Sequence, residues 1–267
     1  MAYATTLDGT NVQKILADDR QTNFVSCSPD GKSILTDAGG KEIDQTDVLS
    51  LVTTPIFSAL PTLYGDPSWS PEGNRIAFNW ITNNSSEIYI GNKDGTNITR
   101  LTNSPGSDRF PNWSADGTKI VFASERNNSP GIFTINVNGT NETRLTSNTF
   151  LDTFPAWSID GTKIAFTRYT SSSADIYLMN SDGTNLTRVT GPNNGINWGA
   201  DWSPDGTKIA FTSSRDGNPE VYVMNPDGSG QTRITNNPST DEAACWLRPI
   251  NTRPNTGKGL RVQYFHN

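Results

Sequence analysis

Short apolar runs alternate with polar turns along the chain, and no stretch shows the apolar spacing of about three to four residues that marks a long amphipathic helix. One representative unit contains the runs 163–167, 175–180 and 186–190, which are rich in Ile, Leu, Phe, Tyr, Val and Thr. Gly, Pro, Asn and Asp separate such runs. Runs of this kind, bounded by turn residues, are typical of strands. The pattern therefore predicts an all-β protein with little helix.

A Trp-Ser-x-Asp-Gly motif recurs together with these strands. Residues 202–206 read Trp-Ser-Pro-Asp-Gly, and the equivalent Trp or Cys positions are separated by 42, 44, 44, 45 and 44 residues. These positions are Cys27, Trp69, Trp113, Trp157, Trp202 and Trp246. A period in the low forties is typical of a four-stranded propeller blade. The repeat therefore predicts a six-bladed β-propeller that occupies residues 1–267 as a single domain.

The two ends of the chain are expected to share one blade. The last unit offers a Trp segment and one further strand at 259–265, whereas two strands without a Trp segment, 2–6 and 12–16, stand at the front. N-terminal strands that complete the C-terminal blade would close the ring and remove exposed strand edges. The expected blades are 22–60, 66–103, 110–147, 154–192, 199–236, and 243–267 together with 1–16.

The recurrent Trp has two readings. A large aromatic side chain at the same place in each blade can fill the wedge between neighbouring blades, and its loss would then cost roughly 3–5 kcal/mol. A role in stacking on a ligand would require an exposed indole. The regular repeat favours the wedge.

The charge balance narrows the possible partners. The chain has 21 basic and 27 acidic residues, a net charge of −6. This sign argues against nucleic acid, whose phosphates a partner must neutralise. The most apolar segment, 48–63, is interrupted by Ser, Thr and Pro, so no membrane insertion is expected. The N-terminal residues lack the basic start and apolar core of a signal peptide, which leaves a cytoplasmic protein or a removed leader open.

Residues 202–211, 214–218 and 221–228 closely resemble the WD-like repeat of the TolB family. The resemblance extends over essentially the whole chain, although it weakens after Leu35 and is lost at 247–249. It implies a non-catalytic, bacterial, periplasmic or secreted scaffold that holds a protein or peptide partner, such as one associated with the cell envelope. A monomer is expected. Because one fold hosts many functions, the resemblance implies fold and an interaction role more firmly than one partner.

The face of the propeller where the units differ from one another is the predicted binding face. A polar residue lies five residues before each Trp-equivalent position. These residues are expected where the chain enters the innermost strands, at the mouth of the channel. With one neighbour, these candidates are Thr22, Tyr64, Asp66, Asp108, Asp152, Asn197 and Asp241. Clustered carboxylates favour hard cations and basic peptides, so Asp108, Asp152 and Asp241 are candidate ligands of Ca²⁺ or another hard cation. The alternative is that each Asp binds backbone N–H groups where the chain enters the inner strand.

Aromatic residues of the variable loops are a second set of candidates. Trp80, Tyr169 and Trp198 stand near Asn, Ser or Thr, a setting that suits stacking on a sugar or anchoring a partner protein. Phe110 and Phe154, each three residues before a Trp, have the alternative of being core residues of the repeat. A glycan-binding, lectin-like propeller is therefore the alternative function.

Catalysis is disfavoured by the residue inventory. The sequence has one His, His266, and carries no nucleophile elbow, phosphate-binding Gly loop, paired-His metal motif or Cys-x-x-Cys. The remaining enzyme alternative is a carbohydrate-active hydrolase or lyase that uses Asp108, Asp152 or Asp241. Cys27 and Cys245 fall in blades that ring closure makes neighbours, so a disulfide is one option and two small core residues the other.

Overall fold

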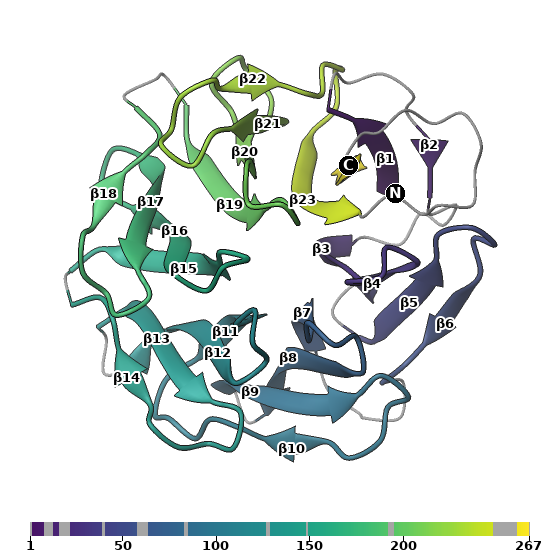
Figure 1. Cartoon of the computed structure of the whole chain (residues 1–267), viewed down its shortest axis with the longest axis vertical. Coiled ribbons are helices and arrows are strands. Elements are labelled where there is room, and N and C mark those ends of the chain that lie inside the picture. The colour runs from purple at the N-terminus through teal and green to yellow at the C-terminus, as the bar shows by residue number, and fades with distance from the viewer. Residues whose placement is uncertain are drawn as a thin grey trace.

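The computed structural model shows six four-stranded antiparallel sheets arranged in a ring (Figure 1). It describes residues 2–7, 13–15, 22–38, 41–57, 64–82, 85–126, 129–147, 149–191, 195–247 and 261–266. Five sheets are formed by consecutive strands of one continuous stretch of chain, and the other combines strands from both ends in the order β2-β1-β24-β23. The number of continuous blades is therefore five, not six, and a composite sheet completes the ring.

The strands of the continuous blades follow the repeat. In chain order they are β3 (Thr22–Cys27), β4 (Ser33–Ala38), β5 (Ile43–Asp47) and β6 (Thr53–Pro55); β7 (Tyr64–Trp69), β8 (Arg75–Thr82), β9 (Ser85–Asn92) and β10 (Thr99–Arg100); β11 (Asp108–Trp113), β12 (Lys119–Ser124), β13 (Gly131–Asn136) and β14 (Thr143–Arg144); β15 (Leu151–Trp157), β16 (Lys163–Tyr169), β17 (Ala174–Asn180) and β18 (Thr187–Arg188); β19 (Asn197–Trp202), β20 (Ile209–Ser213), β21 (Glu220–Met224) and β22 (Thr232–Arg233). The first strand of each blade lies nearest the axis (Figure 1). No described segment is a helix long and apolar enough to cross a membrane.

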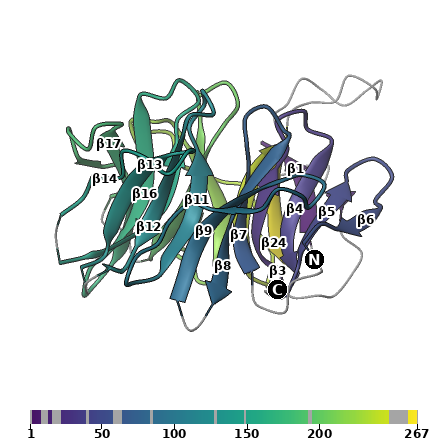
Figure 2. The same ribbon diagram turned by 90° about the horizontal axis from the view of Figure 1, so that it is seen from below.

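The composite sheet joins the chain ends. It contains β1 (Ala2–Thr6), β2 (Gln13–Lys14), β23 (Asp241–Leu247) and β24 (Arg261–His266). β1 pairs with β24 along its whole length, from Ala2 opposite Phe265 to Thr6 opposite Arg261. Both views place the two ends of the chain close together (Figures 1 and 2). Residues 8–12, between the two N-terminal strands, and residues 248 and 249, where the resemblance to the family is lost, lie outside the described residues.

The Ser-x-Asp-Gly turns satisfy their own polar groups. In the copy after β19, the Gly206 N–H donates to the Ser203 carbonyl at 2.8 Å, and Gly206 has a φ of 70° that an L side chain rarely adopts. The Asp205 carboxylate accepts from the Ser203 hydroxyl and the Thr207 N–H. Hydrogen bonds of this kind, from Ser158 and Thr162, lower the pKa of the equivalent Asp160. These acids are therefore structural.

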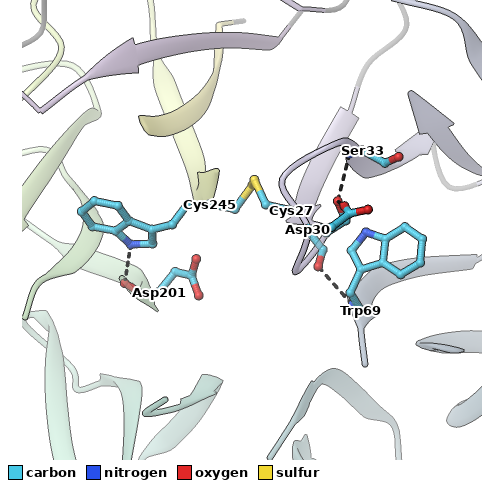
Figure 3. Close-up of a disulfide and its surroundings, with 9 residues drawn as sticks. Cys27, Asp30, Ser33, Trp69, Asp201 and Cys245 are labelled. Carbon is cyan, nitrogen blue, oxygen red and sulfur yellow. Dashed lines mark hydrogen bonds between the residues drawn. A yellow bond between two sulfur atoms is a disulfide. The ribbon is translucent and has the colours of Figure 1, made fainter. Parts of the chain in front are cut away.

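Trp side chains connect neighbouring blades. The indole Nε1–H of Trp113 donates to the Ser68 carbonyl of the preceding blade at 3.2 Å, and that of Trp246 donates to the Asp201 carbonyl at 3.1 Å (Figure 3). In the same sense, the Trp157 backbone N–H donates to the Asn112 side-chain oxygen of the preceding blade at 2.8 Å. Trp69, Trp113, Trp157 and Trp246 are buried, and Trp202 is half-buried. The Trp therefore acts as the expected wedge.

A disulfide links the composite sheet to the first continuous blade. Cys27 ends β3, Cys245 lies in β23, and their Cα atoms are 5.8 Å apart (Figure 3). The two residues are separated by 218 positions in the sequence. The disulfide thus closes the ring covalently at the same place where the two chain ends pair.

Candidate functional site

Each innermost strand contains a bulge that changes which side chains face the axis. Pairing with the second strand shifts between Arg109 and Asn112, and at the equivalent places in the other blades. The residue three before the Trp-equivalent position has a positive φ in five strands: Asp66 (51°), Phe110 (57°), Phe154 (50°), Gly199 (67°) and Ala243 (54°). This conformation is unusual for bulky residues and concentrates at functional sites. The bulge therefore places backbone strain at the axis.

Three Phe rings from different blades meet at the axis. The ring centroid of Phe110 lies 4.2 Å from that of Phe154 and 5.3 Å from that of Phe24, and the centroids of Phe24 and Phe154 are 6.2 Å apart. Their strands β3, β11 and β15 approach the centre from separate directions, with β3 and β15 on opposite sides (Figure 1). We refer to these three residues as the Phe cluster.

A cavity of about 460 Å³ adjoins the Phe cluster and is lined by the innermost strands of every sheet. At one end its lining includes Trp198 and Glu242. At the other end it reaches the residues that follow the Ser of the repeated turns, namely Pro29, Pro71, Ala115, Ile159 and Pro204. The cavity therefore extends to the face of repeated turns, which is the face opposite to the one that the sequence favoured for binding.

Three carboxylates line this axial cavity. Asp66 is buried; its Oδ2 accepts from the Arg109 side chain and the Phe110 N–H, each at 3.3 Å, and burial raises its pKa to about 6. Burial also raises the pKa of Asp201 to about 7 and that of Glu242 above its ordinary value. Among the described residues, the lining has no Lys, Arg or His side chain. The cavity is therefore acidic.

The predicted acids of the channel mouth lie inside the blades instead. Asp152 is buried and forms a paired contact with Arg168 at 2.7 and 2.8 Å. Asp108, also buried, contacts the Arg126 guanidinium at 3.1 Å and the Ser104 hydroxyl. Burial raises the pKa of Asp108, against the opposing effect of Arg126. Both acids hold the inner strand to its own blade.

Two further residues of this set, Asn197 and Asp241, are likewise internal. Asn197 accepts from Ser213 and Arg215 through its side-chain oxygen, and Asp241 accepts from Asn237. Tyr64 begins β7 opposite Trp80, but its side chain lies outside what the structure describes, as does that of Thr22. The described part of the chain contains no group of three or more His, Cys, Asp or Glu residues that could hold a metal ion. Asp108, Asp152 and Asp241 are thus not brought together as ligands.

The three predicted aromatic residues have different surroundings. Trp80 is half-buried, packs against the core and lies 4.8 Å from the Tyr89 ring. Tyr169 is half-buried, and burial raises the pKa of its hydroxyl. Trp198 alone of the three belongs to the cavity lining. The structure therefore brings Trp198 and Asp66 to one site from the predicted set.

Phe24, Asp201 and Glu242 are cavity residues that the sequence did not single out. Asp201 directly precedes its Trp, a position held by Ser, Asn, Ala or Cys in the other units. This difference was the available sequence signal for Asp201, because the other units have a small or neutral residue at the same position. Phe24 shares the position of Phe110 and Phe154, three residues before the Trp-equivalent residue.

Comparison with known proteins identifies the repeat. The family model for the TolB β-propeller domain matches residues 2–170 and 148–249. No match was found among curated protein sequences. A protein assigned as TolB from Agrobacterium tumefaciens has 21% identity and a TM-score of 0.80, covering 88% of this chain and 87% of that one. TolB from Acinetobacter baumannii has 19% identity and a TM-score of 0.70, and the match covers 99% of this chain but 63% of that one. An oligogalacturonate lyase in complex with manganese has 16% identity and a TM-score of 0.62, covering 84% of this chain and 68% of that one. At these identities, the solved structures show a shared fold alone.

Proposed function

Because this chain belongs to the TolB β-propeller domain family, we propose that it is a non-catalytic scaffold that binds a segment of a partner protein in its axial cavity. The observation that carries the proposal is the cavity itself, about 460 Å³ in volume and continuous with the face of repeated turns. A volume in this range suits a small ligand or a few residues of a peptide. The proposal therefore places recognition on the axis.

The lining supports peptide recognition. Pro29, Pro71 and Pro204 surround the turn-side end, and half-buried Trp198 lies toward the other. Aromatic side chains in desolvated pockets contribute strongly to protein interfaces. The inner strands are tied to their neighbours by Trp hydrogen bonds and the disulfide, so little ordering of the scaffold would be required on binding.

A binding role also accounts for how the acids are used. Asp108 and Asp152, which the sequence offered for acid-base chemistry, are each engaged by an Arg inside a blade. The cavity acids Asp66 and Glu242 would oppose a polyanionic sugar chain through like-charge repulsion. These two observations favour the scaffold over a carbohydrate-active enzyme that acts on a uronic-acid polymer.

The disulfide supports an oxidising location. Cys27 and Cys245 are paired, and structural disulfides persist in compartments such as the bacterial periplasm and outside the cell. We place the scaffold in the periplasm, in keeping with its family. An envelope-associated protein is then the natural class of partner.

Blocking the cavity tests this function. Ala115 lines the turn-side end, where another blade carries the larger Ile159, so Ala115→Trp is expected to fold and to narrow the cavity. Ser172→Trp on the exposed β16–β17 loop of the other face is the matched control. A partner captured by the wild type and by the Ser172 variant, but lost with the Ala115 variant, supports the proposal. Capture that survives Ala115→Trp contradicts it.

A further inference from the structure

We infer that the axial cavity selects a peptide segment through a cationic Lys or Arg side chain, held by Asp66, Asp201 and Glu242 against aromatic walls. This inference rests on the proposed function and names the chemistry of the ligand. It follows from three carboxylates that line one cavity, whose described lining includes no Lys, Arg or His. Of the three, only Asp66 contacts a described cationic side chain, that of Arg109.

Asp66 provides the clearest evidence for a missing partner. Its side chain is 2% exposed, and only Oδ2 is engaged, by Arg109 and the Phe110 N–H. Its Oδ1 is buried without a hydrogen-bond partner among the described residues. A buried polar atom left without a partner is costly. The other blades place Phe, Gly or Ala at this position, so the bulge does not require an acid.

Asp201 is a second acid that the fold does not require. The residue directly before the Trp-equivalent position of one blade accepts the backbone N–H of the next Trp: Ser26, before Cys27, does so for Trp69, and Asn112, before Trp113, does so for Trp157. These neutral side chains perform the same task that the Asp201 carboxylate performs toward Trp246. The charge of Asp201 is therefore additional to its structural role, and it lies in the cavity lining.

Glu242 adds a carboxylate on a neighbouring strand. It is half-buried and lines the cavity, and its carboxylate forms no hydrogen bond or ion pair with any described side chain. Burial raises the pKa of its carboxyl without a compensating cation. A bound cation would lower the cost of keeping Glu242 ionised at this place.

An organic cation fits this arrangement better than a metal ion. The acids come from separate strands, β7, β19 and β23, and the described residues contain no compact group of acids that could ligate one ion. The cavity also has aromatic walls, including Trp198 and the Phe cluster. Aromatic faces attract ammonium and guanidinium groups. An extended side chain with a charged end can contact one acid at its tip and aromatic rings along its stem.

The test uses three blocked peptides that differ at one kind of residue: Gly-Lys-Gly-Lys-Gly, its norleucine analogue and its glutamate analogue. Affinity is measured by calorimetry at low salt, with Trp fluorescence as a second readout. The lysine peptide is expected to bind at least tenfold more tightly than either analogue. Contacts between opposite charges in desolvated sites contribute binding free energies that correspond to about this ratio or more. The double variant Asp201→Asn with Glu242→Gln is expected to lose that preference. Glu125→Gln, an exposed acid outside the cavity lining, is the control with unchanged affinity.

The outcomes separate this inference from the proposed function. Equal binding of the lysine and norleucine peptides, lost with Ala115→Trp, would overturn the cationic preference and leave cavity binding intact. Lysine-peptide binding that survives Ala115→Trp would contradict the cavity as the site. Cadaverine is a fourth probe; binding as tight as that of the lysine peptide would assign a free amine in place of a peptide. Absence of lysine-peptide binding at millimolar concentration would overturn the inference.

Discussion

Phe24 and Phe154 meet across the propeller axis with their ring centroids 6.2 Å apart, although they belong to strands on opposite sides of the ring. Phe110 completes the contact, at 4.2 Å from Phe154. The Phe cluster thus forms one wall of the acidic axial cavity. Its geometry depends on bulges that hold Phe110 and Phe154 at positive φ.

The bulge predicts an unusual order of stability at Phe110. Phe110→Ala removes ring packing and keeps a Cβ at a φ of 57°, whereas Phe110→Gly removes the same ring and the backbone strain. The Gly variant is expected to be more stable than the Ala variant by about 1 kcal/mol, the reverse of the ordinary order in strands. Urea unfolding of the two variants measures the difference. If the Ala variant were the more stable of the two, backbone strain at residue 110 would be refuted.

The disulfide is expected to stabilise the ring. Because Cys27 and Cys245 enclose 218 positions of sequence, replacing both with Ala should lower the free energy of unfolding by about 3–5 kcal/mol. Thermal melts with and without reductant measure the loss. The double variant should be insensitive to reductant, and a wild type whose melting temperature is equally insensitive would contradict a stabilising role.

Asp152 should matter for stability and not for recognition. Asp152→Asn leaves the buried Arg168 guanidinium without its ionic partner, and breaking a buried pair costs about 3–5 kcal/mol. Chemical denaturation is expected to show this loss while the affinity for cavity-bound peptides is unchanged. Normal stability combined with lost binding would return Asp152 to the role that the sequence suggested.

Asp201 predicts a decrease in stability with rising pH. Its folded pKa, about 7, lies above the ordinary value of 3.8, so the folded state holds the proton more tightly than the unfolded state. The stabilisation is fully present below pH 4 and is lost as pH rises through 7, which amounts to about 2–3 kcal/mol between pH 5 and pH 8. Asp201→Asn should therefore be more stable than the wild type at pH 8, with a smaller difference at pH 5. Urea unfolding at both values checks this, and a difference that does not change with pH would refute it.

The sequence predicted the repeat better than the site. The period of the Trp positions and the turn chemistry near Gly206 indicated four-stranded sheets and their strand order, because hydrophobic alternation and turn residues are local properties. The pairing of Cys27 with Cys245 stayed open, since it depends on the distance between two neighbouring sheets, and the sequence does not give that distance. The number of continuous blades is five, and the composite sheet depends on pairing between β1 and β24.

The sequence predicted that Asp108 and Asp152 lie at the mouth of the channel, and the structure places both inside their blades for a physical reason. Side chains of a regular strand alternate between its two faces, and a single bulge changes the alternation from that point onward. Counting back from the Trp therefore suggested Asp108 and Asp152 at the channel, whereas they lie inside their blades. The bulge brings Phe110 and Phe154 to the axis instead. The wedge role of the Trp was predictable, since it depends on the repeat alone.

Site-specific photocrosslinking tests the axial cavity most directly. A benzoylphenylalanine placed at Ile159, which lines the cavity and is 43% exposed, is compared with one at Ser172, on the exposed loop of the opposite face, in the presence of an envelope extract. The account predicts that a discrete protein adduct forms from the Ile159 position and is reduced by the lysine peptide, with none from Ser172. Adducts that form only from Ser172 would contradict it.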